Sequence, residues 1–252
     1  MALHVLSKGI MGTPWLLLLV LLPRAAAQPA GICNPVDLAG PYAFQLTGST
    51  DISGTPKPAV SLGLISFNDR GSLSGTASVA FRGLLLGNPV TGTYEAKPDC
   101  SVVWKLQDDS GGFQNFSGTL SADATSLPFR QTDPGGSQRG IMKKIPGACS
   151  AALLLKSYSF TLSGSTTPML PGQLPRTVSA KGTLDIARNG TFQVESDCSV
   201  TFALTPPPQD GQAAAPVPAN MRGFLVNGGR EILAFQTDPG AMVAARFTSD
   251  GK

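Results

Sequence analysis

Two carboxylate pairs are the side chains best suited to acid–base chemistry, because they flank two cysteines in similar sequence blocks. The pairs are Glu95 with Asp99, and Glu195 with Asp197. Two carboxylates can divide the general-acid and general-base roles when their environments separate their pKa values. Only the aspartates occupy equivalent positions in the two blocks, and an aspartate before a cysteine is also typical of a turn. We interpret the aspartates as turn residues and assign no catalytic residue.

Histidine chemistry is excluded by composition. The only histidine is His4, which lies in a predicted signal peptide, so the chain after residue 27 contains no imidazole. This excludes Ser-His-Asp and Cys-His catalysis as well as imidazole ligands for a metal. Two thiols in each half of the chain do not by themselves make a zinc site. We therefore predict no metal and no cofactor.

The four cysteines occupy equivalent positions in the two halves of the chain. Each half has one cysteine ahead of its first expected strand and one in the block Asp-Cys-Ser-Val. An even number of cysteines in an exported chain is typical of a disulfide framework. We predict the pairs Cys33–Cys100 and Cys149–Cys198, each contributing about 4 kcal/mol in the chain-entropy model.

An internal repeat constrains the fold most strongly. The block Asp99–Val102 (DCSV) returns as Asp197–Val200. Three further blocks recur in the same order: Tyr42–Thr50 as Tyr158–Thr166, Gly63–Leu73 as Gly182–Phe192, and Gln131–Gly135 as Gln236–Gly240. The offset between the copies is 119 residues at Gly63 and 98 at Cys100, so the second copy lacks 21 residues. The repeat predicts two homologous domains, the second shortened.

Alternating apolar and polar residues predict strands in both copies. Tyr42, Phe44 and Leu46 alternate with small or polar neighbours, and this period is typical of a half-buried strand. Turn formers that end in glycine, such as Asn68–Gly71 and the repeated Thr-Asp-Pro-Gly, predict hairpins and β-turns. We expect eight strands in the first copy and six or seven in the second. The pattern favours an all-β protein of two tandem antiparallel β-barrels, with β-sandwiches as the alternative.

The aromatic residues on the alternating faces are the candidates for ligand binding. They are Tyr42, Phe44, Phe67, Trp104, Tyr158, Phe160 and Phe202. An eight-stranded barrel is just wide enough either to fill with side chains or to hold one small ligand. The sequence therefore predicts that these side chains point into the barrels, and it leaves open whether the barrels are filled or hollow.

The first 27 residues have the pattern of a signal peptide. Lys8 precedes the apolar run Trp15–Leu22, and Ala25–Ala27 supplies small residues for cleavage. That run is far shorter than the roughly 20 residues of a membrane span. We predict a secreted or periplasmic protein without a membrane span. The expected parts are the signal peptide (1–27), a first barrel domain (28–146) and a second barrel domain (147–252).

Charge argues against a nucleic-acid partner. The chain has a formal net charge of +3, only 14% charged residues and no run of basic residues. Nucleic-acid-binding domains carry a basic patch or stripe. The composition is that of a secreted β protein whose polar surface is largely uncharged.

The order of the motifs resembles a known group of proteins. A cysteine, Gly-x-Tyr-x-Phe-x-Leu-x-Gly, a glycine-ended hairpin, Gly-Thr-Tyr, Asp-Cys and Thr-Asp-Pro-Gly follow one another over residues 33–144, and most recur over 149–248. This resembles small secreted bacterial proteins of unknown function whose domains are similar to the allene oxide cyclase barrel, a relative of the calycins. The resemblance implies β-barrels. Plant allene oxide cyclases cyclise a fatty-acid epoxide in such a barrel, but no motif here matches their catalytic residues.

Three functions follow from these observations. The leading prediction is a non-enzymatic exported protein that binds a small apolar ligand or a cell-surface partner. The second is a cyclase or isomerase that positions an apolar substrate inside the barrel. The third is a structural module of the cell envelope. A cavity with a buried carboxylate would favour the enzyme, whereas a packed interior with an exposed apolar patch would favour interaction with a partner.

Overall fold

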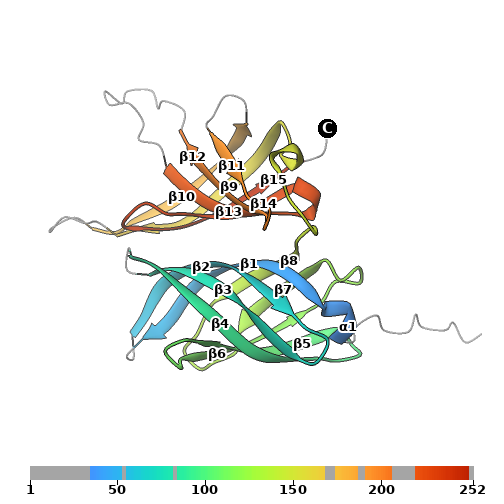
Figure 1. Cartoon of the computed structure of the whole chain (residues 1–252). Coiled ribbons are helices and arrows are strands. Elements are labelled where there is room, and N and C mark those ends of the chain that lie inside the picture. Colours follow the sequence, from blue (N-terminus) through green and yellow to red (C-terminus); the bar gives the residue numbers. More distant parts are fainter. Residues whose placement is uncertain are drawn as a thin grey trace, which may run out of the picture. The chain divides into compact units, whose positions relative to one another are not determined.

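The computed structural model describes residues 35–52, 55–81, 84–167, 174–186, 191–205 and 219–249 (Figure 1). The chain divides into one unit of Met1–Ala30 and another of Gly31–Lys252, and all described residues belong to the second. The predicted signal peptide and Cys33 therefore lie outside the described residues. No helix in these ranges is long and apolar enough to cross a membrane.

Strands make up nearly all of the described elements. The first copy contains β1 (Gly40–Ile52), β2 (Thr55–Phe67), β3 (Ser72–Phe81), β4 (Leu84–Ala96), β5 (Ser101–Asp108), β6 (Phe113–Thr119), β7 (Ser126–Gln131) and β8 (Arg139–Lys144). The second contains β9 (Ser157–Thr166), β10 (Arg176–Asp185), β11 (Phe192–Val194), β12 (Ser199–Leu204), β13 (Ala219–Val226), β14 (Glu231–Gln236) and β15 (Ala241–Thr248). Three short helices are α1 (Pro35–Leu38), η1 (Ala151–Leu153) and η2 (Asn227–Gly229). The predicted boundary between the domains, after residue 146, lies between β8 and η1.

The eight strands of the first copy close into an antiparallel barrel, hereafter the barrel. Each strand pairs with its sequence neighbours, and β1 closes the barrel by pairing with β8 as well as with β2. Tyr42, Phe44 and Leu46 are buried in the barrel interior, and the intervening Ala43 and Gln45 lie on its outer face. The structure thus confirms the all-β fold and the eight-stranded barrel predicted for the first copy.

The barrel strands differ in length. Strands β1 to β4 have 13, 13, 10 and 13 residues, whereas β5 to β8 have 8, 7, 6 and 6. β1 pairs with β8 only as far as Thr47, and β4 pairs with β5 only from Val90 onward. The four long strands therefore continue past the short ones at one end of the barrel. We call this extension, from Gly48 in β1 to Pro89 in β4, the long wall.

The second copy forms an open sheet, hereafter the second sheet, in the order β10-β9-β15-β14-β13-β12-β11. Phe192 of β11 pairs with Phe202 of β12 as Tyr94 of β4 pairs with Trp104 of β5, so β11 takes the place of β4. No described strand takes the place of β3. With an odd number of antiparallel strands, the edge strands β10 and β11 run in the same direction and cannot close an antiparallel ladder. Where the sequence predicts a second, shortened barrel, the described strands form this seven-stranded sheet instead.

The outer face of the barrel shares a hydrophobic cluster with the second sheet. Ala43, Val60, Leu62 and Ala80 are outward-facing residues of β1 to β3, yet each is at most 4% exposed. They belong to one cluster with apolar residues of β13, β14 and β15. Successive residues of β14 and β15 are buried, which is typical of strands covered on both faces. The second sheet thus contributes one face to its own core and the other to the barrel.

Polar groups fix the same interface. Nε2 of Gln45 in β1 donates hydrogen bonds to the backbone oxygens of Ala234, at 2.6 Å, and Ala245, at 2.8 Å. Lys143 of β8 forms an ion pair with the buried Glu231 of β14, with Nζ 3.6 Å from Oε2. Because a buried polar or charged group is costly unless it is paired, these contacts specify how the barrel and the second sheet meet.

Candidate functional site

The repeated aspartates cap turns. Oδ1 of Asp99 accepts hydrogen bonds from the backbone N of Ser101 at 3.0 Å and from its Oγ at 2.6 Å, and these bonds lower the pKa of Asp99. Oδ1 of Asp197 accepts the same backbone bond from Ser199 at 2.9 Å. Both aspartates and the two glutamates considered with them are exposed. The turn interpretation is confirmed, and these carboxylates lie on the surface rather than in a shared cleft.

The cysteine that follows each aspartate completes the same turn. Cys100 and Cys198 both have positive φ, 66° and 69°, a conformation that residues other than glycine rarely adopt. Cys198 forms the predicted disulfide with Cys149. Cys100 is also disulfide-bonded, but Cys33 lies outside the described residues, so their pairing stays a prediction. Within the described ranges no group of three or more His, Cys, Asp or Glu side chains could hold a metal ion.

The repeated Thr-Asp-Pro-Gly turn is also structural. The carboxylate of Asp133 accepts hydrogen bonds from the backbone N of Asn115 at 2.8 Å and from its Nδ2 at 2.6 Å. Asp238 accepts the same two bonds from Asn220, at 2.9 and 2.6 Å. Sequence reasoning missed both asparagines, although each lies 18 residues before its aspartate. That shared spacing was the signal that could have found them.

One half of the barrel interior, which we call the filled half, is packed with aromatic side chains. The rings of Tyr42 and Phe67 meet edge to face at 5.5 Å. Trp104 stacks on Phe116 at 5.5 Å and meets the edge of Phe129 at 5.1 Å. All five side chains are buried. Buried aromatic pairs stabilise a core both by the large area that they bury and by their ring contacts. The structure therefore places three of the predicted ligand-binding residues, Tyr42, Phe67 and Trp104, in packed surroundings.

The two equivalent tyrosines each donate a buried hydrogen bond to a distant backbone oxygen. Tyr42 Oη donates to the backbone oxygen of Ala124 at 2.8 Å, and Tyr158 Oη donates to that of Gly229 at 2.6 Å. Burial, with smaller effects from nearby acids, raises the pKa of Tyr42 to about 12. Both hydroxyls are thus held neutral as donors that tie β1 and β9 to the loops opposite them.

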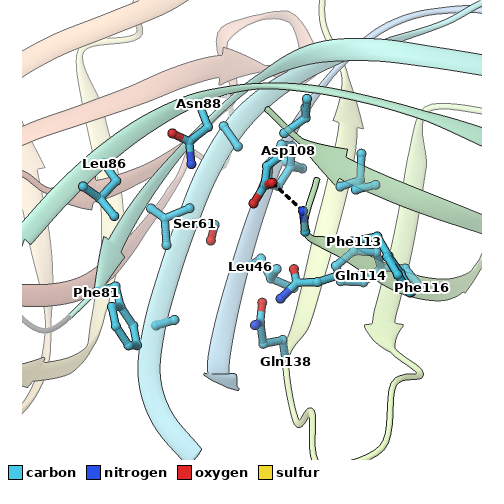
Figure 2. Close-up of a pocket in the computed structure, with 17 residues that line it drawn as sticks. Leu46, Ser61, Phe81, Leu86, Asn88, Asp108, Phe113, Gln114, Phe116 and Gln138 are labelled. Carbon is cyan, nitrogen blue, oxygen red and sulfur yellow. Dashed lines mark hydrogen bonds between the residues drawn. The ribbon is translucent and has the colours of Figure 1, made fainter. Parts of the chain in front are cut away.

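The other half of the barrel, the open half, holds a cavity of about 350 Å³ that is shown in Figure 2. Its walls are mainly apolar, with Phe44, Leu46, Val90, Leu106 and Phe116 among them. Ligand sites typically occupy about 300–1,000 Å³, so this cavity suits a small molecule. Of the seven predicted ligand-binding residues, Phe44 is the one that lines it. The barrel interior is therefore filled at one end and hollow at the other.

Small side chains create the open half. Ala59, Ser61 and Ala77 line the cavity from β2 and β3. The ring of Phe44 covers Gly63, where an added Cβ would clash with the ring and with the backbone oxygen of Thr76. Glycine at this position lets the ring of Phe44 pack directly against the backbone of β2.

The rim of the cavity carries exposed apolar side chains. Leu86, on the long wall, is 48% exposed, and Phe113, at the start of β6, is 56% exposed. Both residues line the cavity. Leu84 and Leu85, the first residues of β4, are also exposed but do not line this cavity. An apolar molecule leaving the cavity would therefore meet apolar surface at its mouth.

The aromatic residues predicted for the second copy form part of its core. Tyr158 and Phe202 are buried and Phe160 is half-buried. Phe247 of β15 joins them, with its ring 5.3 Å from Phe202 and 5.9 Å from Phe160. The structure brings these residues together by packing, and Phe160 covers Gly182 as Phe44 covers Gly63 in the barrel.

Comparison with known proteins does not assign the chain to a family. The chain matches no protein-family model, and it is not significantly similar to any curated protein with which it was compared.

Proposed function

We propose that this protein binds a small apolar molecule in the open half of its barrel. The observation that carries the proposal is the contrast between the two ends of one interior. Aromatic side chains fill one end, while small side chains leave an apolar cavity at the other. A cavity of this kind costs stability because its lining atoms lack packing partners, so its presence favours a binding role.

The proposal includes export. The disulfide between Cys149 and Cys198 supports an oxidising compartment, which is where such bonds persist. The signal-peptide pattern of residues 1–27 points to the same place. The closed eight-stranded barrel is the architecture that a resemblance to allene oxide cyclase-like, calycin-related proteins implies, and that relationship is part of the proposal.

The hydrogen bonds of the one acidic residue described at the cavity favour binding over catalysis. Asp108 is the acid among the described lining residues. Its Oδ1 accepts hydrogen bonds from the backbone N of Ser110 at 3.0 Å, from Ser110 Oγ at 2.6 Å and from the backbone N of Gly112 at 2.9 Å. A carboxylate committed to a turn in this way is poorly suited to general acid–base work, which needs free access to the reacting proton.

A matched pair of substitutions tests the binding site. Ala77 lines the cavity, and its neighbour Thr76 projects from the opposite, exposed face of β3. Ala77→Phe should fill the cavity, whereas Thr76→Phe adds the same ring outside it. The chain from residue 28 is titrated with an environment-sensitive apolar dye, and the fold of each variant is checked by circular dichroism.

Saturable dye binding by the wild type and by Thr76→Phe, together with its loss in folded Ala77→Phe, is the expected result. The absence of saturable binding by the wild type, or equal binding by Ala77→Phe, would contradict the proposal.

A further inference from the structure

The polar groups that line the open half are, with one exception, uncharged. They are the hydroxyl of Ser61 and the side-chain amides of Asn88, Gln114 and Gln138, all labelled in Figure 2. A hydroxyl or an amide can both donate and accept hydrogen bonds. Gln138 is only 3% exposed, so its amide is held within the protein rather than in bulk water. These groups suit a ligand with a neutral polar end.

The strand ends place several of these groups at the mouth of the cavity. Asp108 is the last residue of β5, Gln114 is the second residue of β6, and Gln138 immediately precedes β8. The apolar lining residues Leu106 and Phe116 lie further along β5 and β6, away from these ends. A ligand can therefore place its apolar part against the floor and its polar end among these side chains.

The one charged residue among the described residues that line the cavity is an aspartate. Asp108 is the exception among the lining groups, and its hydrogen bonds to Ser110 and Gly112 anchor the carboxylate at the mouth. The described lining residues include no lysine or arginine. Lys57 lies two residues beyond Ala59 toward the tip of the long wall, and it does not line the cavity.

A second basic residue lies near the mouth but faces away from the interior. Lys105 is exposed and occupies the face of β5 opposite to Trp104 and Leu106. Its Nζ lies 3.9 Å from the centre of the Phe113 ring, a cation–π contact. Lys105 therefore packs on a ring at the rim and is not itself one of the residues that line the cavity.

We infer that the open half selects apolar molecules that end in a neutral hydroxyl, carbonyl or amide group and discriminates against carboxylates. The inference rests on the proposed function. A carboxylate bound among these groups would lose hydration with no lysine or arginine among the described lining residues to pair with, and Asp108 would repel it. A neutral polar end has a much smaller desolvation penalty and can form a hydrogen bond with the amide of Gln138. The ligand class is therefore a neutral amphipathic molecule such as a fatty alcohol or amide, rather than a free fatty acid.

Matched ligands with the same number of carbon atoms test this inference. Decanol, decanamide and decanoate are each titrated at pH 7 against the chain from residue 28, by displacement of the apolar dye. Decanol and decanamide should bind at least about tenfold more tightly than decanoate, a difference of about 1.4 kcal/mol. Binding of decanoate as tightly as decanol would overturn the inference while leaving the proposed binding function intact. Failure of all three to displace the dye would overturn both.

Two variants test whether a positive charge inside the cavity, but not one on the long wall, changes the preference for decanoate. Gln114→Lys places an ammonium group among the lining amides, so it should raise the affinity for decanoate relative to decanol. Lys57→Gln removes the basic residue of the long wall and should leave that ratio unchanged. A lower ratio of decanoate to decanol affinity in Lys57→Gln would show that Lys57 serves as an anion site and would also overturn the inference.

Discussion

Replacement of Trp104 tests whether the filled half is a packed core. Trp104 is only 3% exposed and lies against the rings of Phe116 and Phe129. Its indole N–H is buried and has no hydrogen-bond partner among the described residues. Trp104→Ala removes a large buried side chain and should lower the free energy of unfolding by about 3–5 kcal/mol. Trp104→Phe keeps a ring in the core and also removes the unpaired donor.

The second substitution should cost much less than the first. An unpaired buried donor carries a desolvation penalty of about 1–3 kcal/mol, and Trp104→Phe recovers it while losing part of the ring packing. The net change in the free energy of unfolding should therefore be about 1 kcal/mol or less. Neither variant should abolish dye binding, because Trp104 does not line the cavity of the open half.

Urea unfolding followed by circular dichroism measures both changes, since the midpoint and the slope together give the free energy of unfolding. Trp104 is the only tryptophan of the chain after residue 27, so the fluorescence of the wild type reports on the filled half alone. The reasoning would be refuted if Trp104→Ala cost less than about 1 kcal/mol, or if Trp104→Phe were as costly as Trp104→Ala.

Four further predictions concern pH (two of them), disulfide pairing and folding. Hydrogen bonds, first from Ser121, lower the pKa of Asp123 to about 2, so stability should fall as the pH drops from 3.8 toward 2, and Asp123→Asn should flatten that loss in acid titration. Burial raises the pKa of Tyr42 to about 12, so stability should also fall as the pH rises from 10 toward 12, and Tyr42→Phe should weaken that dependence, to which the raised pKa values of Tyr94 and Tyr158 also contribute. Non-reducing peptide mapping should find Cys33 joined to Cys100, and free thiols or a bridge to the second copy would exclude this pairing. Residues 28–146 should show a cooperative unfolding transition alone, although the fragment exposes the apolar outer face that the second sheet covers.

The barrel was predictable because each of its strands carries a clear period of two. Tyr42, Phe44 and Leu46 lie on one face in the sequence pattern, and the structure buries them on one face. The closure of the second copy was not predictable from the same signal. The sequence shows that 21 residues are missing, but closure depends on whether an odd or even number of strands remains, and strand ends cannot be counted that closely from alternation.

The contact between the barrel and the second sheet is visible in the sequence of the second copy but not in that of the barrel strands. The runs Ile232–Phe235 and Ala241–Ala245 are continuously apolar, which is typical of strands buried on both faces. Their partner surface on the barrel consists of ordinary small and branched residues such as Ala43 and Val60, which look like the solvent side of a strand. Only the three-dimensional arrangement shows that they are covered.

The cavity proposed as the binding site shares strands with the aromatic residues predicted from the sequence, but Phe44 is the one of the seven that lines it. Sequence reasoning looked for a cavity beside the large aromatic residues, and most of these fill the space instead. The cavity lies where the inward residues are small, at Ala59, Ser61 and Ala77, and such residues carry little signal of their own. Phe44 is the link between the two, because it lines the cavity and covers Gly63.

The most direct test of the central claim is to observe which side chains touch a bound ligand. Isotope-filtered nuclear Overhauser measurements on the chain from residue 28 with decanol would detect contacts between the alkyl chain and protein methyl groups. Contacts to the methyl groups of Ala59, Ala77 and Val79, which line the open half, are the predicted result. Contacts confined to the exposed Leu84 and Leu85 or to the second sheet, or no contacts at all, would contradict the account.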